Sequence, residues 1–171
     1  GSDKIKLKEI IENRIKIFSW AKKVYLDLKF IEGVKRTIAI GSGKGGVGKS
    51  SVTVGLALNL KKRGFKVGIL DADIYGPNIP NIVGLSKQDV LTKEENGKVK
   101  FIALDHEGLK IMSVAMLAKS NQSLAWRGPI LTRLLNQFLY QVDWGELDFL
   151  LIDLPPGTGD TQITLLQDSP I

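Results

Sequence analysis

Residues 41–50 read Gly-Ser-Gly-Lys-Gly-Gly-Val-Gly-Lys-Ser and decide the fold class. The fixed positions of G-x-x-x-x-G-K-[ST], the pattern of a phosphate-binding loop, are occupied by Gly43, Gly48, Lys49 and Ser50. Glycines let backbone N–H groups surround a phosphate closely, because they carry no Cβ. We expect Lys49 to reach the outer phosphates of a nucleotide and the Ser50 hydroxyl to bind Mg²⁺.

The sequence on both sides of the loop supplies the context that this motif needs. Residues 37–40, Thr-Ile-Ala-Ile, form a short apolar and β-branched run that is typical of a buried strand. The residues after the loop predict a helix that ends at Gly64, a left-handed cap after three basic residues. The amino end of such a helix attracts an anion by about 0.3–1 kcal/mol. These flanks argue against a chance glycine-rich turn.

Two further apolar runs predict buried strands, at residues 66–71 and 147–153. Uninterrupted apolar runs are typical of parallel strands that are covered on both faces. The order strand, helix, strand makes a βαβ unit, so we expect an α/β three-layer sandwich with a mostly parallel sheet.

Residues 86–112 differ in character and predict a small excursion from this sheet. Short strand-like pieces lie at 99–103 and 109–112, with a turn at 95–97. A helix is expected to start near Pro129, a residue suited to the first helical position. Its apolar stripe would consist of Leu131, Leu134, Leu135, Phe138 and Val142.

Acidic residues follow two of the predicted strands. Asp71 and Asp73 lie at the end of the strand at 66–71, and Asp153 ends the strand at 147–153. Ligands of open parallel sheets bind at the carboxyl ends of the strands. We therefore expect Asp73 and Asp153 to join Ser50 at a metal site, and Gly157 to place a backbone N–H near the terminal phosphate. For Asp71, a strand-end cap and a site residue both remain open.

The net charge of +6 is unevenly distributed. Residues 1–36 hold ten Lys or Arg against five Asp or Glu, whereas the rest of the chain is near neutral. This contrast divides the chain into a basic, helical arm at 1–32 and a nucleotide-binding portion at 33–171. A helix that packs on the domain or on a partner is the favoured interpretation of the arm. Nucleic acid and anionic lipid remain open as alternative partners.

The composition argues against disulfides, thiolate metal sites and membrane-spanning helices. The sequence has no cysteine, so the chain forms neither disulfides nor thiolate metal sites. No apolar run approaches the ~20 residues that span a membrane, and no secretory signal is visible, so we expect a cytoplasmic protein. The single histidine, His106, stands in Asp-His-Glu-Gly, where a solvated turn is favoured over a metal ligand.

Four motifs together resemble one family. The loop, with its second lysine at Lys44, resembles the deviant Walker A motif of the MinD, ParA and nitrogenase iron-protein group. The three others are Asp71-Ala-Asp-Ile-Tyr-Gly-Pro-Asn-Ile-Pro80, Trp126-Arg-Gly-Pro129 and Asp153-Leu-Pro-Pro-Gly-Thr-Gly-Asp160. In this order, from about Gly33 to Ile171, they are similar to the Mrp/NBP35 (ApbC) family of iron–sulfur cluster carrier ATPases.

The resemblance implies a Mg²⁺-ATP-dependent P-loop ATPase that works as a homodimer through its nucleotide face. Lys44 would cross to the partner's nucleotide, Lys49 would act on the phosphates, and Asp73 would orient the attacking water. The metal would be held by Ser50, Asp73 and Asp153. The expected nucleotide contacts are Gly43, Lys44, Gly45, Gly46, Val47, Gly48, Lys49, Ser50, Ser51 and Gly157.

One departure from the family pattern affects the cargo. The family carries a Cys-x-x-Cys pair for a [4Fe–4S] cluster in its carboxyl-terminal half, and the present sequence ends before that region. We therefore expect a chain truncated on its carboxyl-terminal side, with a cluster, and apo iron–sulfur proteins as partners, only in a complete form. A positioning switch of the ParA or MinD type, which binds DNA or membrane, is the alternative function.

Overall fold

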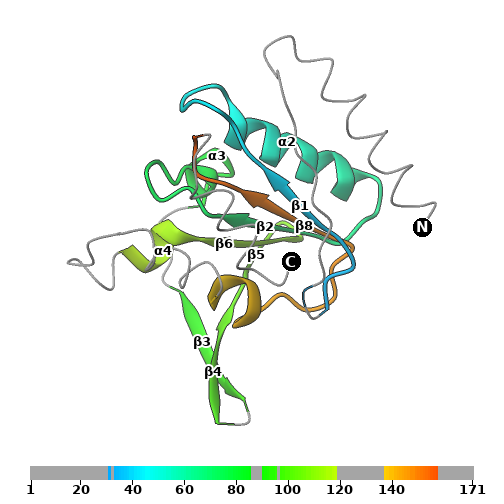
Figure 1. Ribbon diagram of the computed structural model, residues 1–171. Helices are drawn as coiled ribbons and strands as arrows, with labels where there is room; N and C mark the ends of the chain where they lie inside the picture. Colours follow the sequence, from blue (N-terminus) through cyan, green and yellow to red (C-terminus); the bar gives the residue numbers. More distant parts are fainter. Residues whose placement is uncertain (1–30, 32, 86–89, 96, 119–136, 158–171) are drawn as a thin grey trace.

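A computed structural model describes residues 31, 33–85, 90–95, 97–118 and 137–157 (Figure 1). The elements follow in the order β1 (Thr37–Ile40), α2 (Lys49–Lys62), β2 (Val67–Asp71), α3 (Ile79–Ile82), β3 (Leu91–Glu95), β4 (Lys98–Ile102), β5 (Leu104–His106), β6 (Leu109–Ser113), α4 (Val114–Ala118), β7 (Val142–Asp143) and β8 (Phe149–Asp153). The predicted strands at 37–40, 66–71 and 147–153 and the helix that ends before Gly64 are confirmed.

The main sheet has five strands in the order β1-β8-β2-β6-β5. Its first four strands are parallel, and β5 pairs with β6 in the antiparallel direction. The α/β class with a mostly parallel sheet is therefore confirmed. Because β1, β8 and β2 run in the same direction, their carboxyl ends meet at one edge, where the loop after β1 begins.

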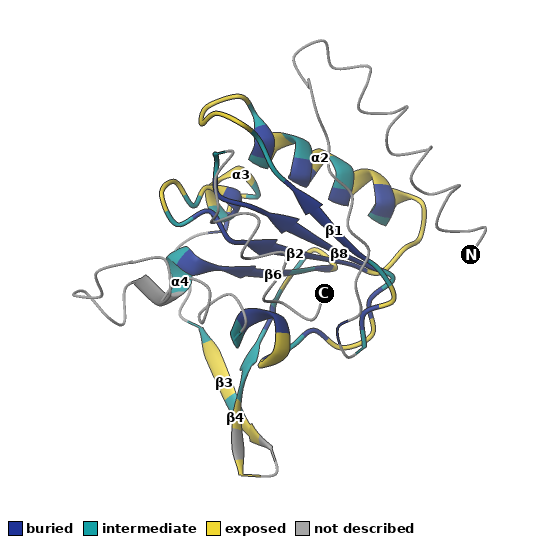
Figure 2. Cartoon of the chain, in the orientation of Figure 1, coloured by how far each residue is buried: buried dark blue, intermediate teal, exposed yellow. Residues whose placement is uncertain are grey.

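Both faces of the parallel strands β1, β8, β2 and β6 are mostly buried, as the apolar runs predict, whereas β5 at the edge is partly exposed (Figure 2). Alternate strand residues such as Ile38, Ile69 and Leu151 pack with α2 and α3 on one face. Their neighbours in the strands pack on the other face against residues that include Phe138 and Trp144. The packing at Gly68 in β2 is so close that an added Cβ would lie 2.6 Å from Leu147 Cδ1.

The strand at 109–112 corrects the predicted extent of the excursion. Leu109–Ser113 forms β6, which pairs with β2 along its whole length and belongs to the main sheet. The excursion is the β3–β4 hairpin, which projects from the body and joins β7 in a separate three-stranded sheet (Figure 1). A short apolar run predicts a strand but carries no information about which strand it pairs with.

The apolar stripe predicted after Pro129 is also corrected. Phe138 is fully buried in a helical stretch at 137–140, whereas Val142 lies in β7 and pairs with Phe101 of β4. The predicted turn at 95–97 is a hairpin connection, with Gly97 at φ 71°. Among the described residues, no helix is long and apolar enough to cross a membrane.

Several predictions lie outside the described residues. They concern the arm at 1–32 apart from Ile31, Trp126-Arg-Gly-Pro129, the helix start near Pro129 with Leu131, Leu134 and Leu135, and Gly159 and Asp160.

Candidate nucleotide-binding site

A hollow of about 490 Å³ lies at the carboxyl-terminal edge of the sheet. One wall comes from the loop and the start of α2, and the opposite wall from the segment between β2 and α3. The lining residues are Ser42, Gly45, Gly46, Gly48, Lys49, Ser50, Ser51, Asp73, Tyr75, Gly76, Asn78, Ile82 and Pro156. The structure thus brings the glycine loop and the predicted carboxylates to one place.

The backbone of the loop presents an anion-binding surface. Gly46 and Gly48 adopt φ angles of 73° and 88°, a left-handed conformation that favours glycine. Helix α2 begins immediately afterwards, and Gly48 offers no side-chain cap. The first turn of α2 contains no acidic residue, so no carboxylate of that turn competes with an anion for its N–H groups.

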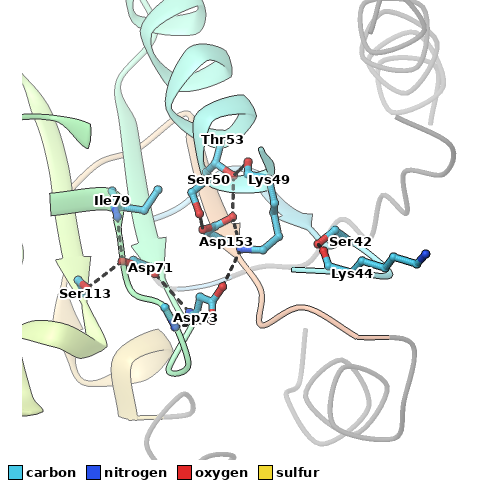
Figure 3. A network of polar contacts seen from close by, with 11 residues as sticks. Ser42, Lys44, Lys49, Ser50, Thr53, Asp71, Asp73, Ile79, Ser113 and Asp153 are labelled. Atoms are coloured by element: carbon cyan, nitrogen blue, oxygen red, sulfur yellow. Dashed lines mark hydrogen bonds and ion pairs between the residues drawn. The ribbon is translucent and has the colours of Figure 1, made fainter. Parts of the chain in front are cut away.

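Lys49 is a buried cation with charge partners but without a hydrogen bond. Its Nζ atom lies 2.9 Å from Asp153 Oδ1 and 3.3 Å from Asp73 Oδ2, and its side chain is 6% exposed (Figure 3). Both contacts are ion pairs, but among the described residues neither has hydrogen-bond geometry, so N–H groups of the ammonium remain available for a further acceptor. A buried donor of this kind calls for an oxygen ligand, and a phosphate at the adjacent loop fits that requirement.

Asp153 is the centre of the polar contacts at the start of α2. This fully buried carboxylate accepts hydrogen bonds from Ser50 Oγ at 2.5 Å and from Thr53 Oγ1 at 2.9 Å. Ser50 and Asp153 thereby place hard oxygen donors side by side, which suits Mg²⁺. Among the described residues, no group of three or more His, Cys, Asp or Glu side chains is arranged to hold a metal ion. Mg²⁺ takes few protein ligands and completes its shell with water and phosphate oxygens.

Asp73 comes from the segment after β2 rather than from a strand. Its Oδ1 atom accepts the Gly76 N–H at 3.2 Å, which closes a short turn and leaves Oδ2 directed at Lys49. The carboxylate therefore stands at the wall of the hollow that faces the glycine loop.

Asp71 has a different environment from the other two carboxylates. It accepts hydrogen bonds from the N–H groups of Asp73 and Ile79, both at 3.2 Å, and from Ser113 Oγ at 3.0 Å. Burial raises the pKa of Asp71 to about 7, while the Ser113 hydroxyl acts in the opposite direction. Of the two open interpretations, the contacts favour a cap that holds the following segment.

Lys44 and Gly157 are not directed at the hollow. Lys44 is exposed and its side chain extends away from Asp153 and Asp73, while Ser42 Oγ donates to its backbone oxygen at 2.9 Å (Figure 3). The Gly157 N–H donates to the backbone oxygen of Ser42 at 2.9 Å, which ties the segment after β8 to the loop.

Sequence reasoning missed two buried hydroxyl residues. Thr53 lies one helical turn after Lys49, so the i, i+4 spacing on α2 was a signal for a shared face. Ser113 had no such signal, because the placement of β6 beside β2 was not predicted. His106 ends β5, and no metal-binding group includes it in the described residues.

The chain is similar to known proteins over most of its length. An iron-sulfur cluster carrier protein from Aquifex aeolicus is 50% identical over 141 residues, which are 82% of this chain and 38% of that protein. A protein of the same name from Synechocystis sp. is 46% identical over 164 residues, which are 95% of this chain and 46% of that protein. The chain thus spans less than half the length of these two curated relatives.

A solved structure, the nucleotide-binding protein in complex with ADP from Archaeoglobus fulgidus, with Co found by PIXE, has 44% identity and a TM-score of 0.68. The alignment covers 81% of this chain and 51% of that one. Residues 33–171 match the family model described as ParA, NUBPL iron-transfer P-loop NTPase. The chain therefore belongs to this family of iron-transfer P-loop NTPases.

Proposed function

We propose that the chain binds Mg²⁺-ATP in this hollow, hydrolyses it, and provides the nucleotide-dependent part of an iron–sulfur cluster carrier. The observation that carries the proposal is Lys49, a buried ammonium that is ion-paired with Asp73 and Asp153 without hydrogen-bond geometry to either, beside a glycine loop. The names of the two curated relatives and the ADP in the Archaeoglobus fulgidus protein support it.

Each residue of the site has a task in this proposal. The loop N–H groups and the amino end of α2 bind the phosphates, and Lys49 moves from its carboxylate partners to the phosphate oxygens. Ser50 and Asp153 hold Mg²⁺, which when bound neutralises charge on the phosphates. Asp73 orients a water whose oxygen bonds to the terminal phosphorus as the bond to the leaving ADP oxygen breaks.

The same proposal gives Lys44 a partner in a second copy of the chain. Lys44 is exposed, and its side chain points away from Asp73 and Asp153 of the same chain (Figure 3). Around the hollow, Val47, Tyr75 and Ile82 expose 39%, 76% and 38% of their surface. An apolar rim beside an outward cation suits a face-to-face dimer, in which Lys44 would reach the nucleotide of the other copy.

The cluster itself would be cargo of a longer protein. Cysteine thiolates, the usual ligands of such clusters, are absent from these 171 residues and would come from segments outside them. A positioning switch that binds DNA or membrane remains the alternative. It is less supported, because the family description and both curated relatives name iron transfer or cluster carriage.

Nucleotide binding is tested by titrating the full chain with ATP and Mg²⁺ in a calorimeter. Lys49→Ala should weaken binding at least about ten-fold, because an ammonium in a dry site bonds strongly to phosphate. Lys62→Ala is the matched control, since Lys62 is exposed at the far end of the same helix. Equal affinity of the Lys49→Ala variant and the wild type would refute the proposed site.

The role of Lys44 across the dimer is tested by measuring the rate of phosphate release from ATP. Lys44→Ala should lose hydrolysis while keeping ATP affinity within about three-fold, because a cation in trans acts on charge that develops during the reaction. Sedimentation with ATP should show a dimer of the wild type. Normal turnover by the Lys44→Ala variant would mean that Lys44 has no role in trans.

A further inference from the structure

Three buried polar residues lie side by side across three neighbouring strands. Asp153 ends β8, Asp71 ends β2 and Ser113 ends β6, and the strand register pairs Asp71 with both of the others. All three residues are fully buried. Asp153 belongs to the nucleotide site, whereas Ser113 has no contact with the hollow in the described structure.

Asp71 fastens both ends of the segment at 72–79. Its Oδ1 accepts the N–H of Asp73 near the start of the segment, and its Oδ2 accepts the N–H of Ile79, where α3 begins. The segment between these points carries the Asp73 carboxylate and part of the wall of the hollow. The position of Asp73 relative to Lys49 therefore depends on the orientation of the Asp71 carboxylate (Figure 3).

Ser113 differs from the other two donors to Asp71 because it does not belong to the segment. The N–H groups of Asp73 and Ile79 move with the segment, whereas Ser113 is fixed in the sheet by its pairing with β2. Its hydroxyl donates to Asp71 Oδ2 at 3.0 Å and accepts the Ala115 N–H at 3.1 Å, so its single proton is committed to Asp71. Ser113 is thus the donor that sets the carboxylate plane relative to the sheet.

We propose that Ser113 is a positioning residue that acts through Asp71 to hold Asp73 opposite Lys49. The inference rests on the proposed ATP hydrolysis for its kinetic consequence, but not for its structural one. Removing the hydroxyl leaves the Asp71 side chain free to turn with the segment, although its backbone stays in β2, and Asp73 then loses its fixed distance from Lys49.

The structural consequence is tested by amide hydrogen exchange of the full chain without nucleotide. In Ser113→Ala, the amides of Asp73 and Ile79 should exchange about ten-fold faster, because the Asp71 carboxylate that accepts both N–H groups is no longer held by the Ser113 hydroxyl. Amides within α2 should keep their wild-type rates, and Ser113→Thr should restore protection. If Ser113→Ala does not fold, Ser113→Cys supplies a weaker donor of similar size. Unchanged exchange at both amides, or equal acceleration in α2, overturns the proposal.

The kinetic consequence is a split between binding and turnover. Ser113→Ala should lower kcat about ten-fold or more with ATP affinity within about two-fold of wild type, since the phosphate contacts are intact. Ser113→Thr should recover most of the rate. An unchanged kcat, or an equal loss in Ser113→Thr, contradicts the positioning role. If the wild type itself does not hydrolyse ATP, the proposed function fails, while the exchange rates still decide whether Ser113 holds the segment.

Discussion

Thr53 offers a quantitative test of the contacts at Asp153, through the substitution Thr53→Val. The hydroxyl lies 2.9 Å from Asp153 Oδ1 and 3.0 Å from the backbone oxygen of Lys49, and both atoms are acceptors. Since a hydroxyl has one proton, it donates to one of them at a time, and the carboxylate is the stronger acceptor. Valine fills the same volume without a donor, so the change removes one hydrogen bond to a charged group and leaves no cavity.

A net loss of about 1.5–3 kcal/mol is typical for such a bond. Asp153 keeps the Ser50 hydroxyl and the Lys49 charge, so we expect the lower limit, about 1.5 kcal/mol. For a chain of this length that corresponds to a fall in Tm of roughly 3–6 °C.

Urea unfolding followed by circular dichroism measures the free energy of unfolding. An unchanged m-value would show that the substitution does not alter the denatured state. Two variants control the experiment. Thr53→Ser keeps the donor, and Thr92→Val makes the same chemical change at an exposed position of β3, where we expect an effect within about 0.5 kcal/mol. If Thr53→Val loses no more stability than Thr92→Val, the Thr53 hydroxyl does not stabilise Asp153.

Three further predictions concern the core, the metal and acid stability. Gly68→Ala should lower the free energy of unfolding by about 1–3 kcal/mol in urea titrations, because its Cβ would overlap the packed side chains beside β2. Removing Mg²⁺ with EDTA should weaken ATP binding by the wild type, and calorimetry should show a smaller effect of EDTA on Ser50→Ala, which lacks one proposed ligand. The hydrogen bond from Lys35 lowers the pKa of Asp148 in the folded chain below its ordinary value of 3.8. The ionised Asp148 carboxylate therefore contributes its full stabilisation above pH 3.8, and this stabilisation is lost as the pH falls through the lowered pKa. Thermal melts should therefore show Asp148→Asn less stable than wild type at pH 6, with the difference shrinking toward pH 2.5.

The parts of the fold that could be predicted are those where a local pattern determines the structure. The loop at 41–50 fixes a strand before it and a helix after it, and the continuous apolar run that ends at Asp153 admits only a buried strand. The carboxylates at the strand ends followed from this, because parallel strands bring their carboxyl ends to one edge. Asp153 at the end of β8 and Asp73, two residues after the end of β2, meet at Lys49 for that reason.

The remaining features depend on pairing between distant segments, which local patterns do not encode. The sequence at 109–112 is equally compatible with a strand of a hairpin and with a strand of the main sheet. It joins the main sheet because one edge of β2 is available for pairing. Ser113 could not be assigned a role before that choice was known. Val142 continued a helical stripe in the sequence, although the chain leaves the helix and pairs with β4 there. Each of these is a case where tertiary contacts override a short-range pattern.

The place of β8 in the sheet has a consequence for how the molecule is made. β1 and β2 are the first two strands of the sheet in the order of the chain, yet β8 lies between them in the sheet (Figure 1). Thr37 of β1 pairs with Leu150 of β8, which follows it by 113 residues. During synthesis the loop would leave the ribosome long before the strand that supplies Asp153. The early strands would then keep unpaired edges until β8 arrives, so the nascent chain would be exposed to misassembly. Such non-local pairing slows folding, and a late step that inserts β8 would both close the sheet and create the binding site.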